Sequence, residues 1–460
     1  FDLTIDRRSL STMISGPTRN LLHMSIGLAL IFLAFFSQSF IEETVLDDRS
    51  KTDSSIPQNA GYISQTIIYG TFLFSNLIAP PLVAILRCRW SLLLGSATYT
   101  LLMANFLVLN TPLLYIASAL EGFGSAILWT SVGHYLALNS TENNVGRNSS
   151  IVWIWHTSGL IFGGIFLLVV FGNSDDDSII DEGMTRLIYG VFTGIALLGN
   201  IVFALLPTPD SEREYYEERH GSYTQELIST FKLAITLDSI LFSFTSAFAG
   251  QVMSFWNGVY STALSFTRHS FAVNTKTLVA LNSIAVGVGQ ISASVAFGLY
   301  GHRTLRWGRA PIMVFSCVVG IIAYILAALN LPADSPFNNG TTEPTVINPP
   351  SMAIALICGC IFGIVDAAVN TQIYSLASVI WSEATPQAFA ISKFFHSLLS
   401  TICMYYGSVL EIEWQLALLI AGSLISTVTF VIVERRFISR SAREKLKSDL
   451  LELESTLSEK

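Results

Sequence analysis

The feature that most constrains this chain is a series of about twelve apolar runs, each near the 20 or so residues that a helix needs to cross a bilayer. The first six are Leu21–Phe40, Gly61–Ile85, Trp90–Leu109, Leu113–Leu138, Asn148–Phe171 and Leu187–Leu206. A polar stretch follows, and the other six are Ile235–Tyr260, Leu278–Tyr300, Pro311–Leu331, Met352–Ile380, Phe389–Leu410 and Trp414–Val433. The pattern predicts an all-α membrane protein with about 12 transmembrane helices, arranged as two six-helix halves around a central cavity.

Composition favours lipid as the solvent for these runs. Hydrophobic residues make up 51% of the 460 residues and charged residues only 13%, against roughly 25% charged in soluble domains. A soluble protein of this length cannot bury so much apolar surface in one core. The first run follows a polar lead and is too long for the core of a cleavable signal peptide, so we expect it to stay as a span.

The distribution of basic residues predicts the orientation. Cytoplasmic loops of membrane proteins carry excess Lys and Arg, and a cytoplasmic N-terminus places 20 of the 25 Lys and Arg on the inner side. We therefore expect both termini to be cytoplasmic, in a plasma or endolysosomal membrane. The predicted parts are a cytoplasmic N-terminus, a first bundle, a cytoplasmic linker, a second bundle and a cytoplasmic tail, at 1–20, 21–206, 207–234, 235–433 and 434–460.

The predicted outer loops carry acidic residues instead. Such residues either concentrate cations near an entrance or are simply solvated. Asn339 begins an Asn-Gly-Thr sequence on this side, so it is a predicted glycosylation site. The acidic residues are Glu42, Glu43, Asp47, Asp48 and Asp175 to Asp177.

The two halves of the sequence resemble each other. Residues 123–138 align with 362–377: both segments open with Phe-Gly, and Tyr135 aligns with Tyr374. Further on, His156 in the fifth run aligns with His396 in the eleventh. Together with the division into six runs, a linker and six runs, the alignment indicates two parallel structural repeats.

Few ionisable or strongly polar residues lie inside the runs. Such a group costs at least about 2.5–3.5 kcal/mol at the centre of a span, so it faces protein or a water-filled cavity. One interpretation is a substrate or ion path; the other is hydrogen bonding between helices, worth about 0.6–2 kcal/mol each. We expect Lys393, near an inner helix end, to extend toward the lipid headgroups or to join the path. The candidates are Asp366, Asn370, Gln372, Glu121, His156, His396 and Lys393.

Other patterns exclude function classes or predict local structure. No Walker loop, nucleophile elbow, zinc-protease helix or dinucleotide fingerprint is evident, so we expect neither an enzyme nor a cofactor. The five cysteines show no metal-ligand spacing and are expected to be small buried hydrophobic residues. The sequence has no concentrated basic face, so we do not expect it to bind nucleic acid. Pro80-Pro81 should break or kink the second span.

Several stretches resemble the uncoordinated-ninety-three-like family, also called ion channel regulatory proteins, a branch of the major facilitator superfamily. They are Gly61–Pro80, Ala126–Asn139, Val145–Trp153, Asp366–Tyr374, Gln387–Phe395 and Glu413–Leu416. The resemblance implies the major facilitator fold, with founding members acting as partners of potassium channels and others as trafficking chaperones.

The superfamily's basic, glycine-rich gating loop is present in only one half of this sequence. A stretch after the eighth run resembles it, whereas the first-half counterpart, Leu86–Arg89, lacks the glycines and the acid. The matching residues are Gly298, Gly301, Arg303, Gly308 and Arg309.

Two functions remain open from the sequence. The first is a regulatory or trafficking partner of ion channels or other membrane proteins. The second is a secondary transporter that moves a small solute or ion by alternating access. The uneven gating loop favours the first, and an acid at the middle of a span, Asp366, favours the second.

Overall fold

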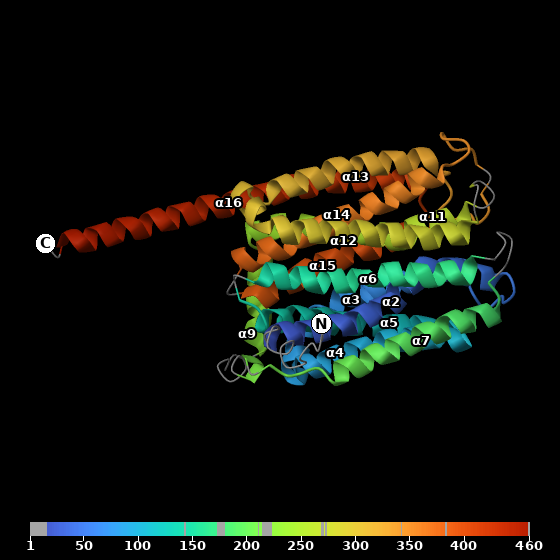
Figure 1. Cartoon of the computed structure of the whole chain (residues 1–460), viewed down its shortest axis with the longest axis horizontal. Coiled ribbons are helices and arrows are strands. Elements are labelled where there is room, and N and C mark those ends of the chain that lie inside the picture. The colour runs from blue at the N-terminus through green and yellow to red at the C-terminus, as the bar shows by residue number, and fades with distance from the viewer. Residues whose placement is uncertain are drawn as a thin grey trace, which may run out of the picture.

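The computed structural model of this chain describes residues 16–141, 144–172, 180–209, 211–213, 223–267, 271, 274–341, 343–381 and 384–458. Within these ranges it leaves the side chains of 145–146, 223–226, 298–307, 378, 385–386 and 444–458 undescribed. Long helices lie side by side in one bundle, and α16 projects from one end of it (Figure 1). The helices of the first half are α2 Gly16–Ser50, α3 Ala60–Ser75, α4 Ala79–Asn105, η1 Phe106–Val108, α5 Thr111–Leu138, α6 Val145–Phe171 and α7 Glu182–Ala204.

The rest of the chain is equally helical. The short helix α9 lies across the end from which α16 projects (Figure 1) and turns by 86° into α10. A π-helix, η2, follows α10 directly. The elements are α9 Tyr223–Ala234, α10 Leu237–Ser254, η2 Phe255–Val259, α11 Tyr260–Phe266, α12 Thr275–Trp307, α13 Ala310–Asn330, α14 Met352–Ile380, α15 Thr385–Gly407 and α16 Ile412–Ser458.

Each predicted apolar run lies almost wholly in helix. Within the described ranges, nine helices are long and apolar enough to cross a membrane, or ten if α9 and the helix after it form one bent span. The other two predicted spans correspond to α3, which has only 16 residues, and to α15. The break predicted at Pro80-Pro81 is confirmed: α3 ends at Ser75, and both prolines lie in the first turn of α4. Prolines fit there because the first turn has no intrahelical acceptor for their missing N–H groups.

Helix contacts repeat between the two halves. In the first half, α2 packs on α6 and α7, α4 on α5 and α7, and α3 on α5. In the second half the corresponding helices make the same pairs: α10 with α15 and α16, α13 with α14 and α16, and α12 with α14. The halves meet where α6 contacts α12 and where α3 contacts α15. These two contacts are equivalent, because α15 corresponds to α6 and α3 corresponds to α12 in the repeat. The repeat seen in the sequence is therefore a repeat of packing.

The acids expected in the first outer loop lie elsewhere. Glu42, Glu43, Asp47 and Asp48 belong to α2, which continues to Ser50, and all four are buried. The prediction of a solvated loop is wrong because polar groups on other segments meet these carboxylates inside the bundle. Asp175 to Asp177 lie outside the described residues.

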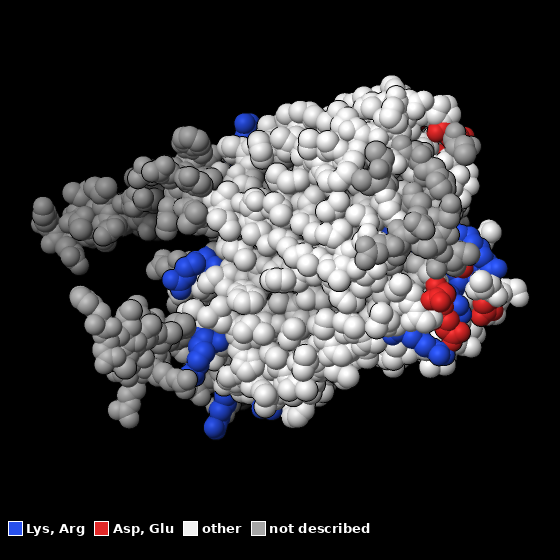
Figure 2. All heavy atoms as spheres, turned by 45° about the vertical axis from the view of Figure 1, so that its right-hand side comes forward, with Lys and Arg blue, Asp and Glu red and all other residues white. Residues whose placement is uncertain are grey.

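Charged side chains gather at the two ends of the molecule and leave the middle bare (Figure 2). On the face shown, Lys and Arg lie at the end that carries the projecting helix, and Asp and Glu lie with further basic residues at the opposite end. Exposed large hydrophobic residues such as Leu101, Phe162, Leu197 and Ile322 lie well inside the helices, away from their ends. This is the surface expected of a bundle whose sides face lipid. The cytoplasmic position of both termini stays a prediction.

Candidate functional site

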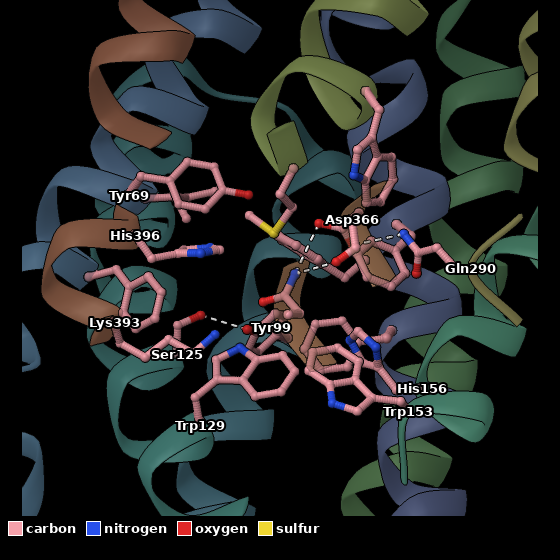
Figure 3. A pocket seen from close by; sticks show the side chains of 18 residues that line it. Tyr69, Tyr99, Ser125, Trp129, Trp153, His156, Gln290, Asp366, Lys393 and His396 are labelled. Carbon is pink, nitrogen blue, oxygen red and sulfur yellow. Dashed lines mark hydrogen bonds between the residues drawn. The ribbon is translucent and has the colours of Figure 1, made fainter. Parts of the chain in front are cut away.

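A small enclosed cavity lies where the two halves face each other. Its volume is about 50 Å³, room for roughly three or four waters, since one water occupies about 10–15 Å³ on this measure. Both halves line it, through α2, α3, α4, α5 and α6 of the first half and α10, η2, α12, α14 and α15 of the second (Figure 3). The lining residues are Phe32, Phe35, Phe36, Ile68, Tyr69, Phe72, Tyr99, Ser125, Trp129, Trp153, His156, Met253, Trp256, Gln290, Asp366, Asn370, Lys393 and His396.

Asp366 is the carboxylate of this cavity. One carboxylate oxygen, Oδ2, accepts a hydrogen bond from Gln290 Nε2 on α12 at 3.1 Å. The other, Oδ1, accepts one from Asn370 Nδ2 at 3.1 Å, and the same amide donates to the Asp366 carbonyl at 3.0 Å. Asn370 reaches it because it lies one helical turn further on the same face of α14. Two neutral amides thus orient the acid toward the cavity.

Lys393 is the cation that faces this carboxylate across the cavity. The prediction that it extends to the headgroups is wrong, because its side chain lines the cavity (Figure 3). Its ammonium lies 5.2 Å from the Trp129 ring centre and 5.7 Å from that of Tyr374. Aromatic faces attract a cation by about 2 kcal/mol or more when water is excluded. They keep Lys393 inside the bundle, where no acid of the described ranges lies within ion-pair distance of it.

The two equivalent histidines both reach the cavity. His156 is packed among aromatic rings, with ring centres 4.3 Å from Phe32, 5.0 Å from Trp153 and 5.2 Å from Trp129. Neither of its ring nitrogens has a hydrogen-bond partner in the described part of the chain. His396 on α15 lines the opposite side of the cavity (Figure 3).

Two other candidates lie away from the cavity surface. Glu121 is fully buried behind it: its Oε1 accepts a hydrogen bond from Ser125 Oγ at 2.6 Å, and Ser125 hydrogen-bonds Tyr99 at 2.6 Å. Ser125 and Tyr99 do line the cavity, so Glu121 is connected to it through one hydroxyl. Gln372 is buried on α14 but does not contribute to the lining.

The structure adds lining residues that sequence reasoning missed. Gln290 carries no signal by itself, since buried amides also bond between helices. The rings of Trp129, Trp153 and Trp256 look like ordinary apolar residues in sequence. The π-helix η2 carries Trp256, and π-turns occur often at functional sites, yet residue type alone does not predict one.

The predicted gating loop is partly described. The surroundings of Gly298 and Gly301 and the side chain of Arg303 lie outside the described part. Gly308 has a φ of 81°, and the N–H groups of Arg309 and Ala310 donate to Glu434 of α16 at 2.6 and 2.7 Å. Arg309 Nε also donates to Ser375 of α14 at 2.8 Å. The loop is therefore tied to two other helices of its own half.

The predicted glycosylation site and the cysteines lie outside the cavity. Asn339 lies in the loop between α13 and α14, and its amide donates to Asp47 of α2; glycosylation stays a prediction. All five cysteines are free thiols, and all but the half-buried Cys360 are buried, so the expectation of small hydrophobic residues is confirmed.

Comparisons with known proteins give the family and the fold. A family model described as "Ion channel regulatory protein UNC-93" matches residues 52–431. The UNC93-like protein MFSD11 of Xenopus laevis is 31% identical, over 92% of this chain and 97% of that protein. Protein unc-93 homolog A of Bos taurus is 23% identical, over 88% and 91%.

Solved transporters share the fold at low sequence identity. The nucleoside transporter NupG has a TM-score of 0.60 at 14% identity, covering 91% of this chain and 99% of that one. The major facilitator superfamily transporter FucP in its outward conformation has a TM-score of 0.59 at 12% identity, over 89% and 98%. With its two packed six-helix halves, this chain is a multi-pass membrane protein that belongs to the UNC-93 family of ion channel regulatory proteins and has the major facilitator superfamily fold.

Proposed function

We propose that this protein is a secondary transporter that binds a small polar solute or an ion between its two halves. The observation that carries the proposal is the enclosed cavity with Asp366 and Lys393 on its wall. Charged groups inside a membrane are costly and persist where they serve a path or a ligand. A midplane site at the contact of two repeats is where alternating access places a substrate.

The cavity size limits what the present conformation can hold. A volume of about 50 Å³ accommodates an ion or a few waters but not a nucleoside or a sugar. A larger solute therefore needs the halves to separate around the cavity, as in rocking between inward-open and outward-open states. The aromatic rings of the lining would then stack on an apolar or cationic part of the solute.

Asp366→Asn tests this proposal. The substitution keeps the size of the side chain and one of its two acceptor oxygens but removes the charge, so we expect solute uptake into proteoliposomes to fall at least about tenfold, the effect of losing about 1.4 kcal/mol. Uptake is measured over a panel of amino acids, nucleosides, sugars and inorganic ions. The matched control is Asp238→Asn, the same change at the start of α10, where Asp238 pairs with Arg436 and Arg440 of α16. Uptake by Asp366→Asn equal to that of wild type would contradict the proposal.

A second candidate is a regulatory or trafficking partner of a potassium channel or another membrane protein. The family's description as ion channel regulatory proteins favours it, and so does one feature of the fold. Helix α16 continues without a break from the membrane-spanning region to Ser458, well beyond the bundle (Figure 1). A projecting helix offers a surface for another protein.

Truncation after Arg443 separates the two candidates. If α16 binds a partner, the truncated chain loses co-purifying channels or receptors from native membranes but keeps solute uptake. If the protein acts only as a transporter, truncation changes neither the co-purifying proteins nor solute uptake. We propose that both termini, and therefore this helix, face the cytoplasm; epitope tags that are accessible only after permeabilisation would support this orientation.

A further inference from the structure

Four carboxylates lie close together in the last turns of α2, and each needs compensation because it is buried. They are Glu42, Glu43, Asp47 and Asp48, with exposed fractions of 1%, 7%, 8% and 0%. A buried ionised carboxylate is stable only with a cation or several hydrogen-bond donors, and otherwise it takes up a proton. The partners of the four acids differ in this respect.

Three of the four acids have charged or dipolar partners. Glu43 Oε2 accepts a hydrogen bond from the Tyr62 N–H at 2.9 Å, at the N-terminus of α3, whose dipole favours a negative charge. Lys51 Nζ lies 2.9 Å from Asp47 Oδ2 and 2.9 Å from Asp48 Oδ1. Each of these three carboxylates therefore has a positive partner inside the protein, either the Lys51 ammonium or the N-terminus of a helix.

Glu42 has only neutral partners. Its Oε2 accepts a hydrogen bond from the amide Nε2 of Gln65 on α3. Its Oε1 is buried without a hydrogen-bond partner, and so is Gln65 Oε1. The nearby polar groups of Ser64 and Gln38 are also uncharged. Within the described part of the chain, no Lys, Arg or His forms an ion pair with Glu42.

The ionisable groups around Glu42 add negative charge or none. Glu43 is its neighbour on α2, Glu121 and Tyr115 face it from α5, Tyr69 from α3 and Tyr189 from α7. Among the basic residues near this end of α2, Lys51 pairs with Asp47 and Asp48, Arg49 and Arg186 pair with Glu182, and Lys276 lies in the first turn of α12. The helices packed against α2, and α2 itself, also carry Arg19, His23, Arg87, Arg89, Arg147 and His156.

The two unpartnered oxygens, Glu42 Oε1 and Gln65 Oε1, can both be satisfied by one proton. Glu42 and Gln65 are already joined by one hydrogen bond, from the amide N–H to the carboxyl, and each keeps one buried oxygen that only accepts. A proton on Glu42 Oε1 would donate to Gln65 Oε1 and close a carboxylic acid–amide ring, satisfying both.

We propose that Glu42 is a proton-binding site of this protein, with Gln65 as the residue that holds the protonated form. The proton comes from water, binds Glu42 Oε1 and returns to water when Gln65 moves away; no other bond forms or breaks. Tyr69, which lines the cavity, lies one turn after Gln65 on the same face of α3. Because α3 also contacts α15 of the other half, movement of the halves would couple this proton to the cavity. That coupling rests on the proposed transport function; the proton site does not.

Infrared spectroscopy of the purified full chain tests the site directly. Buried carboxyls that are protonated near neutral pH give a carbonyl band that shifts on exchange into D₂O, and we expect one component of this band to be missing in Glu42→Gln. Glu43→Gln is the matched control, the same change at the adjacent acid, and should keep that component. An unchanged band in Glu42→Gln, or no band in wild type together with stabilisation by sodium ions, would overturn the proposal.

Two further measurements cover misfolding and coupling. If Glu42→Gln does not fold, Gln65→Met removes the acceptor amide and should shift the band; a band that stays in place counts against the site. In proteoliposomes, a pH gradient should drive solute uptake by wild type, whereas Glu42→Gln should exchange solute but lose at least about 90% of the gradient-driven part. Uptake that ignores the gradient in wild type refutes the coupling while leaving transport intact. Absence of all uptake refutes transport and leaves the infrared result to decide on the proton site.

Discussion

At the scale of single residues, two backbone positions show how the repeated halves differ. Arg87 has φ 67° and ψ 162°, and Gly308 has φ 81° and ψ −179°. Arg87 lies at a kink inside α4, and Gly308 lies between α12 and α13. Both lie in a region of backbone angles that essentially only glycine adopts without strain. The second half has its glycine there, whereas the first half holds an arginine. The loss of glycine from Leu86–Arg89, noticed in the sequence, therefore has a conformational cost.

Gly308→Ala should lower stability for this reason. The expected loss is about 1–3 kcal/mol, since an L-residue is strained in this backbone conformation. The measurement is the thermal unfolding midpoint in detergent. The control is Gly133→Ala in α5, where an added Cβ meets nothing within 4 Å and better helix propensity should stabilise by up to about 1 kcal/mol. If Gly308→Ala matched this control, the strain argument would be wrong.

At the scale of elements, a glutamate accepts hydrogen bonds from the backbone just after the equivalent break in each half. Glu212, after α7, accepts one from the Cys88 N–H, directly after the kink at Arg87 inside α4, at 2.8 Å. Glu434, in α16, accepts from the N–H groups of Arg309 and Ala310 at the start of α13. The first N–H groups of a helix lack intrahelical acceptors and attract negative charge. The cap thus survives in both halves, although the gating-loop sequence does not.

Glu434→Gln should weaken this connection. The amide can accept from only one of the two N–H groups well and carries no charge, so we expect a loss of about 1–3 kcal/mol in stability. Thermal unfolding in detergent measures it, and the exposed Glu413 of the same helix, changed to Gln, is the control. Equal midpoints for the two variants would show that the cap contributes nothing.

At the scale of the whole molecule, the most extensive contacts between the halves are two symmetric ones, α6 with α12 and α3 with α15. Such an interface can rock only if neither pair is fixed. At Gly70 of α3, an added Cβ would lie 3.7 Å from Thr401 Cγ2 of α15, so side chains at these two positions are in contact across the interface.

A chain with both Gly70→Cys and Thr401→Cys should form a disulfide under mild oxidation. By locking the halves together, it should reduce solute uptake at least about tenfold, and a reducing agent should restore it. Each single cysteine variant is the control, and mass spectrometry confirms the bond. Full uptake by the cross-linked protein would exclude rocking at this interface.

The sequence by itself determined the number and order of the helices, because a span is set by local apolar length and by internal backbone hydrogen bonding. It also determined the two-half arrangement and the pairing of Asp366 with Asn370, since residues one turn apart share a helix face. These features depend only on residues close together in the chain.

Only the tertiary structure decided which side chains meet. Lys393 faces the cavity and not the headgroups, Gln372 lies away from the cavity, and Gln290 reaches Asp366 from α12. Glu42, expected in a loop, lies inside the bundle against Gln65. The direction of each helix face depends on packing between segments far apart in the chain, and a polar residue extends a helix where another segment supplies its partner. That information is not local, so no reading of single runs could supply it.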